Sequence, residues 1–236
     1  MAEKKKSTGL PYTMYINRNL ARFVTKRSIH LTPNQITVIG FIILLIGLIL
    51  LPFTANTLLV LISYLLLAFS YVLDSVDGQL ARVRNMCSPF GEWLDHSLDG
   101  LRMILLQLTF LIVLLKTSPN DNIILIILGF SLNIIAITSN YFFSILKQLI
   151  LKQKSGDLIK GNSLKSILSK ILLTPADYGI YIMSVLFLIN TNNFLKLYIL
   201  YGIYYSLIFI SNFIVTVSQN LKLLRLNTTD ESRDAE

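Results

Sequence analysis

Four aspartates in one polar stretch are the residues of this chain best suited to chemistry. Asp74 and Asp77 are three positions apart, and Asp95 and Asp99 are four positions apart. Either spacing places two side chains on the same face of a helix. A helical hairpin would bring the two pairs together, and four carboxylates in a partly desolvated pocket cannot all ionise without a compensating charge.

Divalent cations would supply that charge. An oxygen-only ligand set favours Mg²⁺ or Mn²⁺ over zinc, and Mg²⁺ commonly lies between carboxylates and substrate phosphates. The set therefore indicates phosphoryl-transfer chemistry. An EF-hand is excluded, because Asn85 stands at the twelfth position from Asp74, where a calcium loop needs Glu.

Small residues accompany the aspartates at fixed positions. The stretch reads Asp74-x-x-Asp77-Gly78-x-x-Ala81-Arg82, then eight residues, then Gly91-x-x-x-Asp95-x-x-x-Asp99. It resembles the signature of the CDP-alcohol phosphatidyltransferase family, the CDP-alcohol phosphotransferases, at every defined position. The segment Thr32-Pro33-Asn34-Gln35-Ile36-Thr37 also resembles the usual entry to the first span of that family.

The resemblance implies a role for each matched residue. Asp74, Asp77 and Asp95 would bind Mg²⁺ or Mn²⁺, while Asp99 would complete the metal site and act as general base on the attacking hydroxyl. The family's nucleotide-binding residues would be Asp74, Gly78, Ala81, Arg82 and Gly91, with Asn34 and Thr37 as further contacts. The family also makes a homodimer the expected assembly.

Other polar residues are candidates for the second substrate. Arg102 shares a helix face with Asp95 and Asp99, and is expected to pair with Asp99 or to hold an acceptor phosphate. Asn133, Asn140 and Lys147 repeat every seven residues, so they would line the pocket or, for the two asparagines, join helices by hydrogen bonds. The predicted acceptor-binding residues are Arg102, Asn140, Lys147 and Lys152.

Two neighbours of the motif are expected to be structural. His96 lies about 100° around the helix from Asp95, which favours a supporting role over that of a base. Cys87 is the single cysteine, so no intrachain disulfide can form, and we interpret it as a small packing residue.

Hydropathy identifies the elements that must position these residues. The 236 residues are 53% hydrophobic and 14% charged, and the mean hydropathy of +0.63 indicates a membrane protein. The fold class predicted is all-α integral membrane, with six transmembrane helices after an N-terminal interfacial amphipathic helix. The predicted spans, of which the second and fifth are short, are 36–53, 57–71, 98–115, 123–146, 178–189 and 194–217.

Charge placement predicts the orientation. With a cytoplasmic N-terminus, all of the 21 Lys and Arg residues except Lys116 and Lys196 fall on the cytoplasmic side. Both termini and the aspartates would then be cytoplasmic. The net charge of +8 suits anionic lipid better than nucleic acid, which we do not expect as a partner.

Four segments are predicted along the chain. Residues 1–10 would be a disordered basic N-terminus, and 11–31 an interfacial helix whose apolar stripe is Ile16, Leu20, Phe23 and Val24. Residues 32–225 would form the six-helix membrane domain. Residues 226–236 would be a disordered polar tail.

The favoured function is transfer of a phosphatidyl-type group from a CDP-linked lipid to a small alcohol phosphate, such as glycerol phosphate or an inositol phosphate, with release of CMP. One alternative keeps the chemistry but moves a polar head group from a CDP-alcohol to a lipid or a polyol phosphate. An alternative of another class is a transporter or channel, in which intramembrane charges mark an ion path.

Overall fold

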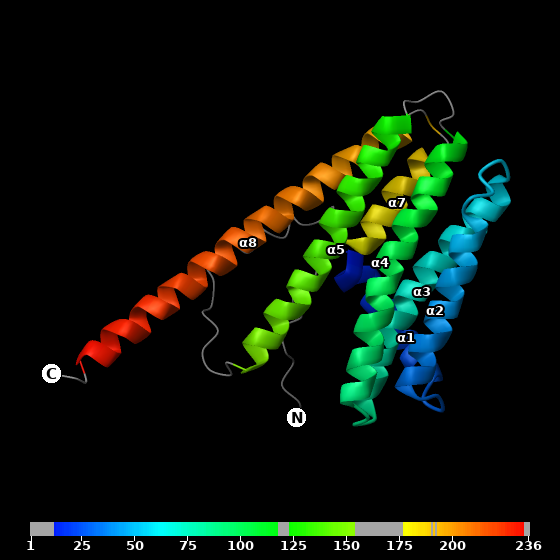
Figure 1. The fold of residues 1–236 in the computed structure, drawn as a ribbon. Coiled ribbons are helices and arrows are strands. Elements are labelled where there is room, and N and C mark those ends of the chain that lie inside the picture. Colours follow the sequence, from blue (N-terminus) through cyan, green and yellow to red (C-terminus); the bar gives the residue numbers. More distant parts are fainter. Residues whose placement is uncertain (1–11, 118–122, 154–176, 190, 192, 234–236) are drawn as a thin grey trace.

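The described residues form helices joined by short turns. The computed structural model describes residues 12–117, 123–153, 177–189, 191 and 193–233, and no strand occurs among them. Figure 1 shows the helices, most of which lie side by side as a bundle. Their bounds are η1 Thr13–Asn17, α1 Arg18–Arg27, α2 Pro33–Leu50, α3 Thr57–Val83, α4 Pro89–Thr117, α5 Ile123–Gln153, α7 Tyr178–Leu188 and α8 Phe194–Arg233.

Five of these helices are long and apolar enough to cross a membrane. They are α2, α3 and α4 in full, residues Ile123–Leu146 of α5, and residues Phe194–Ser218 of α8. Described α7 has 11 residues and falls short of that length. The described residues thus agree with the predicted multi-pass membrane fold through five spans, while the sixth span stays a prediction.

Helix boundaries differ from the predicted spans where polar residues continue a helix. The second span was expected to extend beyond Tyr71, and α3 runs on to Val83, carrying Asp74 and Asp77 with it. Helix α4 begins at Pro89, nine residues before the predicted start. Helix α8 continues to Arg233, beyond the predicted end of the sixth span at residue 217, and the disordered tail at 226–236 stays a prediction.

Local capping explains where the helices that carry the aspartates end and begin. Helix α3 closes with Asn85 at a φ of 54°, and the Met86 N–H donates to the Ala81 carbonyl at 2.8 Å. This is a Schellman turn, in which Asn tolerates the left-handed conformation. The Ser88 hydroxyl then accepts the Gly91 N–H at 3.0 Å, capping α4. The turn reverses the chain and sets the two aspartate pairs opposite each other.

Glycines allow α2 to approach α3 closely. A Cβ at Gly40 would lie 3.2 Å from Cβ of Leu73, and one at Gly47 would lie 3.1 Å from the Ser63 carbonyl. The Ser63 hydroxyl donates to the Gly47 carbonyl at 2.6 Å across the same contact. Small residues and interhelical hydrogen bonds are the usual means of packing membrane helices.

The two asparagines of α5 bind α8. The amides of Asn133 and Asn140 donate to the carbonyls of Tyr198 and Tyr205, each at 2.7 Å. Of the two uses expected for these asparagines, the structure therefore shows the interhelical hydrogen bonds. Beyond this contact α8 inclines away from the other helices (Figure 1).

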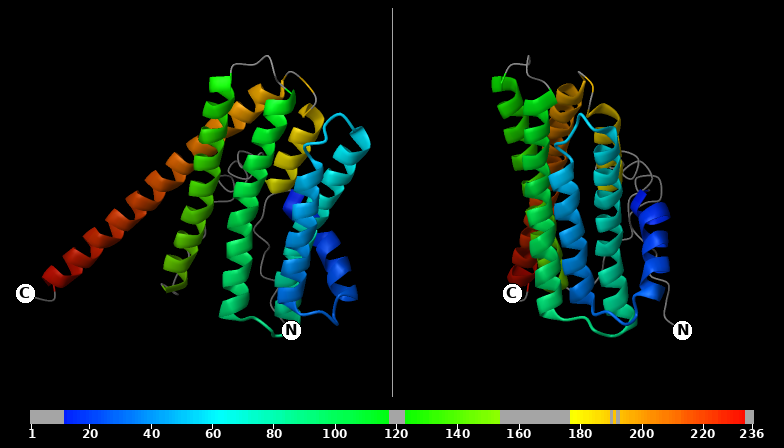
Figure 2. Two further views of the ribbon diagram at one scale, coloured as in Figure 1. Left: turned by 45° about the vertical axis from the view of Figure 1, so that its right-hand side comes forward. Right: turned by 90° about the vertical axis from the view of Figure 1, so that its right-hand side faces the viewer.

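The N-terminal helical segment, η1 and α1, packs along α3 (Figure 2). Its buried face is formed by Asn17, Ala21 and Thr25, whereas Ile16, Leu20 and Phe23 of the predicted stripe are about half exposed. That outward apolar stripe suits a lipid surface. The interfacial position itself stays a prediction, as do the boundaries assigned to the segments.

Candidate metal and nucleotide site

Three of the four aspartates come together between α3 and α4. Asp74, Asp95 and Asp99 each offer a carboxylate oxygen, and these oxygens lie within 4.8 Å of one another. All three side chains are half-buried. Carboxylate oxygens grouped in this way are the donors that hard divalent cations prefer. These three carboxylates thus fit a divalent-cation site, as the sequence predicts.

Arg102 on α4 neutralises part of the cluster. Its Nη1 lies 2.8 Å from Oδ1 of Asp99 and 2.9 Å from Oδ1 of Asp74. The predicted pairing with Asp99 is present, and the contact with Asp74 adds a link from α4 to α3. Arg102 is 6% exposed. A guanidinium held by two carboxylates in a buried position leaves little room for an acceptor phosphate in this conformation.

Asp77 is turned toward α2 instead of the carboxylate cluster. The Thr37 hydroxyl donates to Oδ2 of Asp77 at 2.6 Å, and the Gly78 N–H donates to Oδ1 at 2.5 Å. Asp77 is nevertheless in the wall of the small space that Asp74, Asp95 and Asp99 also line. Its role as a metal ligand stays a prediction, and Thr37 is in a position to control where its carboxylate points.

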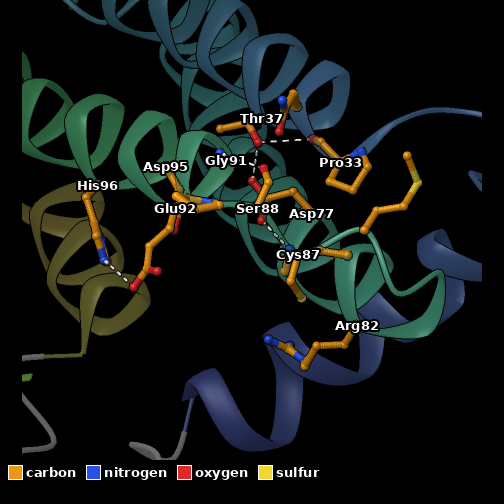
Figure 3. Close-up of a pocket in the computed structure, with 15 residues that line it drawn as sticks. Pro33, Thr37, Asp77, Arg82, Cys87, Ser88, Gly91, Glu92, Asp95 and His96 are labelled. Carbon is orange, nitrogen blue, oxygen red and sulfur yellow. Dashed lines mark hydrogen bonds and ion pairs between the residues drawn. The ribbon is translucent and has the colours of Figure 1, made fainter. Parts of the chain in front are cut away.

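A cavity of about 490 Å³ opens beside the cluster (Figure 3). Asp77 and Asp95 contribute to its wall, so it reaches the acidic site. Every residue predicted to contact the nucleotide except Asp74 lines it, namely Asn34, Thr37, Gly78, Ala81, Arg82 and Gly91. The sequence did not predict Met86, Cys87 or Ser88 as lining residues.

The cavity is formed where two helices begin. Pro33 and Asn34 belong to the first turn of α2, and Pro89 and Gly91 to that of α4. Helix N-termini present backbone N–H groups and favour anions. Arg82 lines the same cavity and adds a cation. These surroundings suit a diphosphate. The sequence signal for the two helix N-termini is the Thr-Pro pair at residues 32–33 and the Ser-Pro pair at residues 88–89.

Glycines keep the cavity open. A Cβ on Gly91 would lie 3.0 Å from Oδ1 of Asn34 and 3.1 Å from Oγ of Ser88. At Gly78 the nearest atom would be Nη1 of Arg82, at 3.4 Å. Gly91 thus permits a close approach of α4 to Asn34 of α2, while the guanidinium of Arg82 lies over Gly78.

Cys87 is exposed and lines the cavity. Its interpretation as a packing residue is therefore wrong, because the turn between α3 and α4 carries it to the surface. His96 also lines the cavity, and its Nε2 lies 3.9 Å from Oε1 of Glu92 on the same helix. The carbonyl of His96 accepts a hydrogen bond from the Tyr141 hydroxyl at 2.6 Å.

The predicted acceptor site is only partly within the described residues. A second cavity, of about 230 Å³, lies between α4, α5, α7 and α8 and includes Asn140 and Tyr178 in its wall. The Asn140 amide is already bonded to Tyr205. The side chains of Lys147 and Lys152, and the lysines at 154, 160, 165 and 170, lie outside the described part of the chain. Acceptor binding by Asn140, Lys147 and Lys152 stays a prediction.

Sequence reasoning missed the tyrosines that enclose the cluster. The ring of Tyr178 on α7 lies 5.9 Å from Cζ of Arg102, and Tyr141 on α5 is within 3.3 Å of the position a Cβ on Gly100 would take. Both tyrosines fall inside apolar runs, where an aromatic residue gives no sign of a functional neighbour.

Comparison with known proteins agrees with this geometry. Residues 30–217 match the family model described as CDP-alcohol phosphatidyltransferase. The match includes the helices that carry the acidic cluster and both helix N-termini of the cavity.

Three curated relatives are similar over shorter stretches. An archaetidylinositol phosphate synthase of Pyrococcus horikoshii is 40% identical over 77 residues, or 33% of this chain and 39% of the relative. A bifunctional IPC transferase and DIPP synthase of Aquifex aeolicus is 36% identical over 90 residues, 36% of this chain and 20% of the relative. Mouse cholinephosphotransferase 1 is 38% identical over 98 residues, 38% of this chain and 25% of the relative.

Proposed function

Since the chain belongs to the CDP-alcohol phosphatidyltransferase family, and is thus a CDP-alcohol phosphotransferase, we propose which groups it transfers. The donor is a CDP-linked lipid, the acceptor is a small phosphorylated alcohol, and the products are a phospholipid and CMP. The active site faces the cytoplasm, as both termini do, and the working unit is a homodimer.

One observation carries the proposal. The acidic cluster of Asp74, Asp95 and Asp99 adjoins a cavity that begins at two helix N-termini and contains Arg82. The cluster can hold cations, and the cavity can hold the anionic nucleotide next to them. A transporter has no need of a nucleotide cavity at its charged site, so this arrangement supports the enzyme.

The chemistry requires one bond to form and one to break. The hydroxyl oxygen of the acceptor attacks the phosphorus that carries the lipid alcohol, and the bond from that phosphorus to CMP breaks. Asp99 accepts the hydroxyl proton, and CMP departs as the anion. Asp74, Asp95 and Asp99, with Asp77 once it turns from Thr37, would hold Mg²⁺ or Mn²⁺. A cation held there would supply charge neutralisation for the diphosphate.

Asp99 is free to act as a base only if its contact with Arg102 leaves one oxygen available. Nη1 of Arg102 contacts Oδ1 of Asp99, and no contact from Arg102 to Oδ2 is described. In this proposal Arg102 therefore holds Asp74 and Asp99. The acceptor phosphate is bound by the lysines at 147 and 152–170 instead.

The relatives support two different substrate pairs. The name of the Pyrococcus protein supports an inositol phosphate as acceptor. The mouse relative is named as a cholinephosphotransferase, which supports the alternative of head-group transfer to a lipid. The aligned stretches span at most 39% of either relative. We favour the phosphorylated acceptor because of the lysines at 147 and 152–170 on the cytoplasmic side.

The proposal is tested by CMP release from the purified full chain in lipid nanodiscs. A CDP-linked diacyl lipid is offered with glycerol phosphate, inositol phosphate or inositol, and CDP-choline is offered with diacylglycerol. We expect CMP only with a CDP-lipid and a phosphorylated alcohol, in the presence of Mg²⁺ or Mn²⁺. Release from CDP-choline and diacylglycerol alone would establish the head-group alternative instead.

Two variants test the residue roles. Asp95→Asn and Asp99→Asn are each expected to lower kcat by about 10²-fold or more, the usual contribution of a positioned base or metal ligand. Asp230→Asn, near the end of α8, makes the same chemical change far along the chain and should retain the wild-type rate. Wild-type rates in both site variants would contradict the mechanism.

A further inference from the structure

A second buried carboxylate lies outside the acidic cluster. Asp177 immediately precedes α7 and is 1% exposed. No cation is described beside it, and three hydrogen-bond donors surround it instead. The Gly179 N–H donates to its Oδ1 at 3.4 Å, as at a capped helix N-terminus. The other two donors come from Thr13, 164 residues earlier in the chain.

Thr13 uses both of its polar groups on Asp177. Its N–H donates to Oδ2 at 3.0 Å, and its hydroxyl donates to Oδ1 at 2.9 Å. The hydroxyl oxygen is also 2.8 Å from the Tyr71 hydroxyl. Because the threonine proton is engaged by the carboxylate, Tyr71 is the donor in that bond. Thr13 thus joins Asp177 to α3, and we call Thr13, Tyr71 and Asp177 the clasp.

A second bond fixes the same segment beside the active site. The Asn17 amide donates to the Ser75 hydroxyl at 2.7 Å, and Asn17 is fully buried. Tyr71 and Ser75 are the neighbours of Asp74 on α3, at three positions before it and one after it. The N-terminal segment is therefore hydrogen-bonded to α3 both before and after Asp74, a residue of the acidic cluster.

Aromatic rings continue the contact from the clasp to Arg102. The ring centroids of Tyr71 and Tyr178 are 4.7 Å apart. The Tyr178 ring in turn lies 5.9 Å from Cζ of Arg102, at cation–π distance. Tyr178 directly follows Asp177, so the bonds that hold Asp177 also determine the position of that ring.

We propose that Asp177 and Thr13 are positioning residues for the acidic cluster: the clasp sets Tyr71 and Tyr178, and these hold Arg102 against Asp74 and Asp99. No contact of Thr13 or Asp177 with the acidic cluster or with the wall of the nucleotide cavity is described. The N-terminal segment, which the sequence assigns only to the membrane surface, is thereby a part of the active site. The test of this inference by CMP release rests on the proposed function, whereas the test by Mn²⁺ binding does not.

Packing around the clasp supports a defined geometry. The Tyr12 ring lies directly over Gly179, where a Cβ would come within 2.0 Å of Cε1 of that ring. Burial, and then the charge of Asp177, raise the pKa of the Tyr12 hydroxyl, so Tyr12 stays neutral beside the carboxylate. A neutral ring can pack against Gly179, two residues from Asp177, without adding charge.

The main test compares Thr13→Val with Thr13→Ser. Valine keeps the shape and the backbone N–H but removes the hydroxyl that links Asp177 to Tyr71, whereas serine keeps that hydroxyl. We expect Thr13→Val to raise the Kd of Mn²⁺ about tenfold, measured by electron paramagnetic resonance without substrate, because supporting residues typically act by 10- to 100-fold. Thr13→Ser should bind Mn²⁺ as the wild type does.

Activity provides the second readout. In Thr13→Val, kcat for CMP release should fall about tenfold while KM for the CDP-alcohol changes less than about twofold, since the nucleotide cavity is untouched. Asp177→Ala removes the acceptor of the Thr13 hydroxyl and should lower kcat at least as much as Thr13→Val. Combining the two changes should cause no further loss than Asp177→Ala alone, because the Thr13 hydroxyl acts through that carboxylate.

Two outcomes would overturn the proposal. In one, Thr13→Val lowers the thermal stability but leaves the Kd of Mn²⁺ unchanged, so that the clasp only stabilises the fold. In the other, Thr13→Val and Thr13→Ser lose Mn²⁺ affinity equally, so that the hydroxyl has no part in it. Failure of the wild type to release CMP would count against the proposed function alone, because the Mn²⁺ measurement needs no substrate.

Discussion

Nη1 of Arg102 lies 2.9 Å from Oδ1 of Asp74, joining α4 to α3. Arg102 lies three residues beyond the last position of the aspartate motif, and Asp74 is the first position of that motif. The same nitrogen contacts Asp99. The guanidinium of one buried arginine therefore holds the two halves of the carboxylate site together.

Replacing Arg102 should destabilise the protein mainly when metal is absent. Arg102→Met leaves Asp74 and Asp99 without their cation, and removing one partner of a buried pair costs about 3–5 kcal/mol. Mg²⁺ can compensate the carboxylates, so the loss should shrink when it is added. Unfolding temperatures in nanodiscs, with EDTA and with Mg²⁺, measure the difference. Lys116→Met, near the far end of α4, is the control, and an equal loss in both conditions would contradict the prediction.

Thr37 should control the metal requirement through Asp77. Its hydroxyl donates to Oδ2 of Asp77 at 2.6 Å, so Thr37→Val releases that carboxylate without changing the size of the side chain. We expect the Mn²⁺ concentration for half-maximal CMP release to shift about tenfold, and Thr37→Ser to keep the wild-type value. A change in KM for the CDP-alcohol with no change in the metal requirement would instead make Thr37 a direct nucleotide contact.

Gly91→Ala should weaken nucleotide binding selectively. The added Cβ would lie 3.0 Å from Oδ1 of Asn34 and narrow the junction of α2 and α4. We expect KM for the CDP-alcohol to rise about tenfold, equivalent to ~1.4 kcal/mol, with kcat less affected. Steady-state kinetics separate the two constants. An unchanged KM in a variant of normal melting temperature would show that the nucleotide does not approach Gly91.

Cys87 offers a chemical test of the cavity. It is the only cysteine of the chain and is exposed in the cavity wall. A maleimide should therefore label the wild type, and saturating CMP with Mg²⁺ should slow that labelling at least about fivefold. Labelling of Ala55→Cys in a Cys87→Ser background should be insensitive to CMP, because residue 55 lies in the turn between α2 and α3. Equal protection at both positions would exclude the cavity as the specific site.

The same two cysteines test the orientation. Residues 55 and 87 lie at opposite ends of α3, which crosses from Thr57 to Val83. With the active site in the cytoplasm, a membrane-impermeant maleimide should label Ala55→Cys in intact cells but reach Cys87 only after permeabilisation. The reverse pattern would place the site on the outer face and overturn the predicted topology.

Local signals account for what the sequence could predict. The spacing of Asp74 with Asp77, and of Asp95 with Asp99, is a helix period, so each pair shares a face wherever the helix lies. Lengths of apolar runs predict membrane helices because the bilayer has a fixed thickness. The family resemblance adds roles for the motif residues. All of these are properties of neighbouring positions, and one sequence is enough to read them.

Contacts between segments that are distant in the sequence could be identified only from the tertiary structure. Three such contacts are those of Asp77 with Thr37, of Arg102 with Asp74, and of Thr13 with Asp177, 164 positions apart. They depend on how the helices pack, which the periodicity of the sequence does not encode. Tyr178 looks like any aromatic residue of an apolar run until packing sets its ring beside Arg102. The sequence by itself thus determined the reaction class and the ligands' spacing, whereas the three-dimensional packing decided which side chains hold those ligands in place.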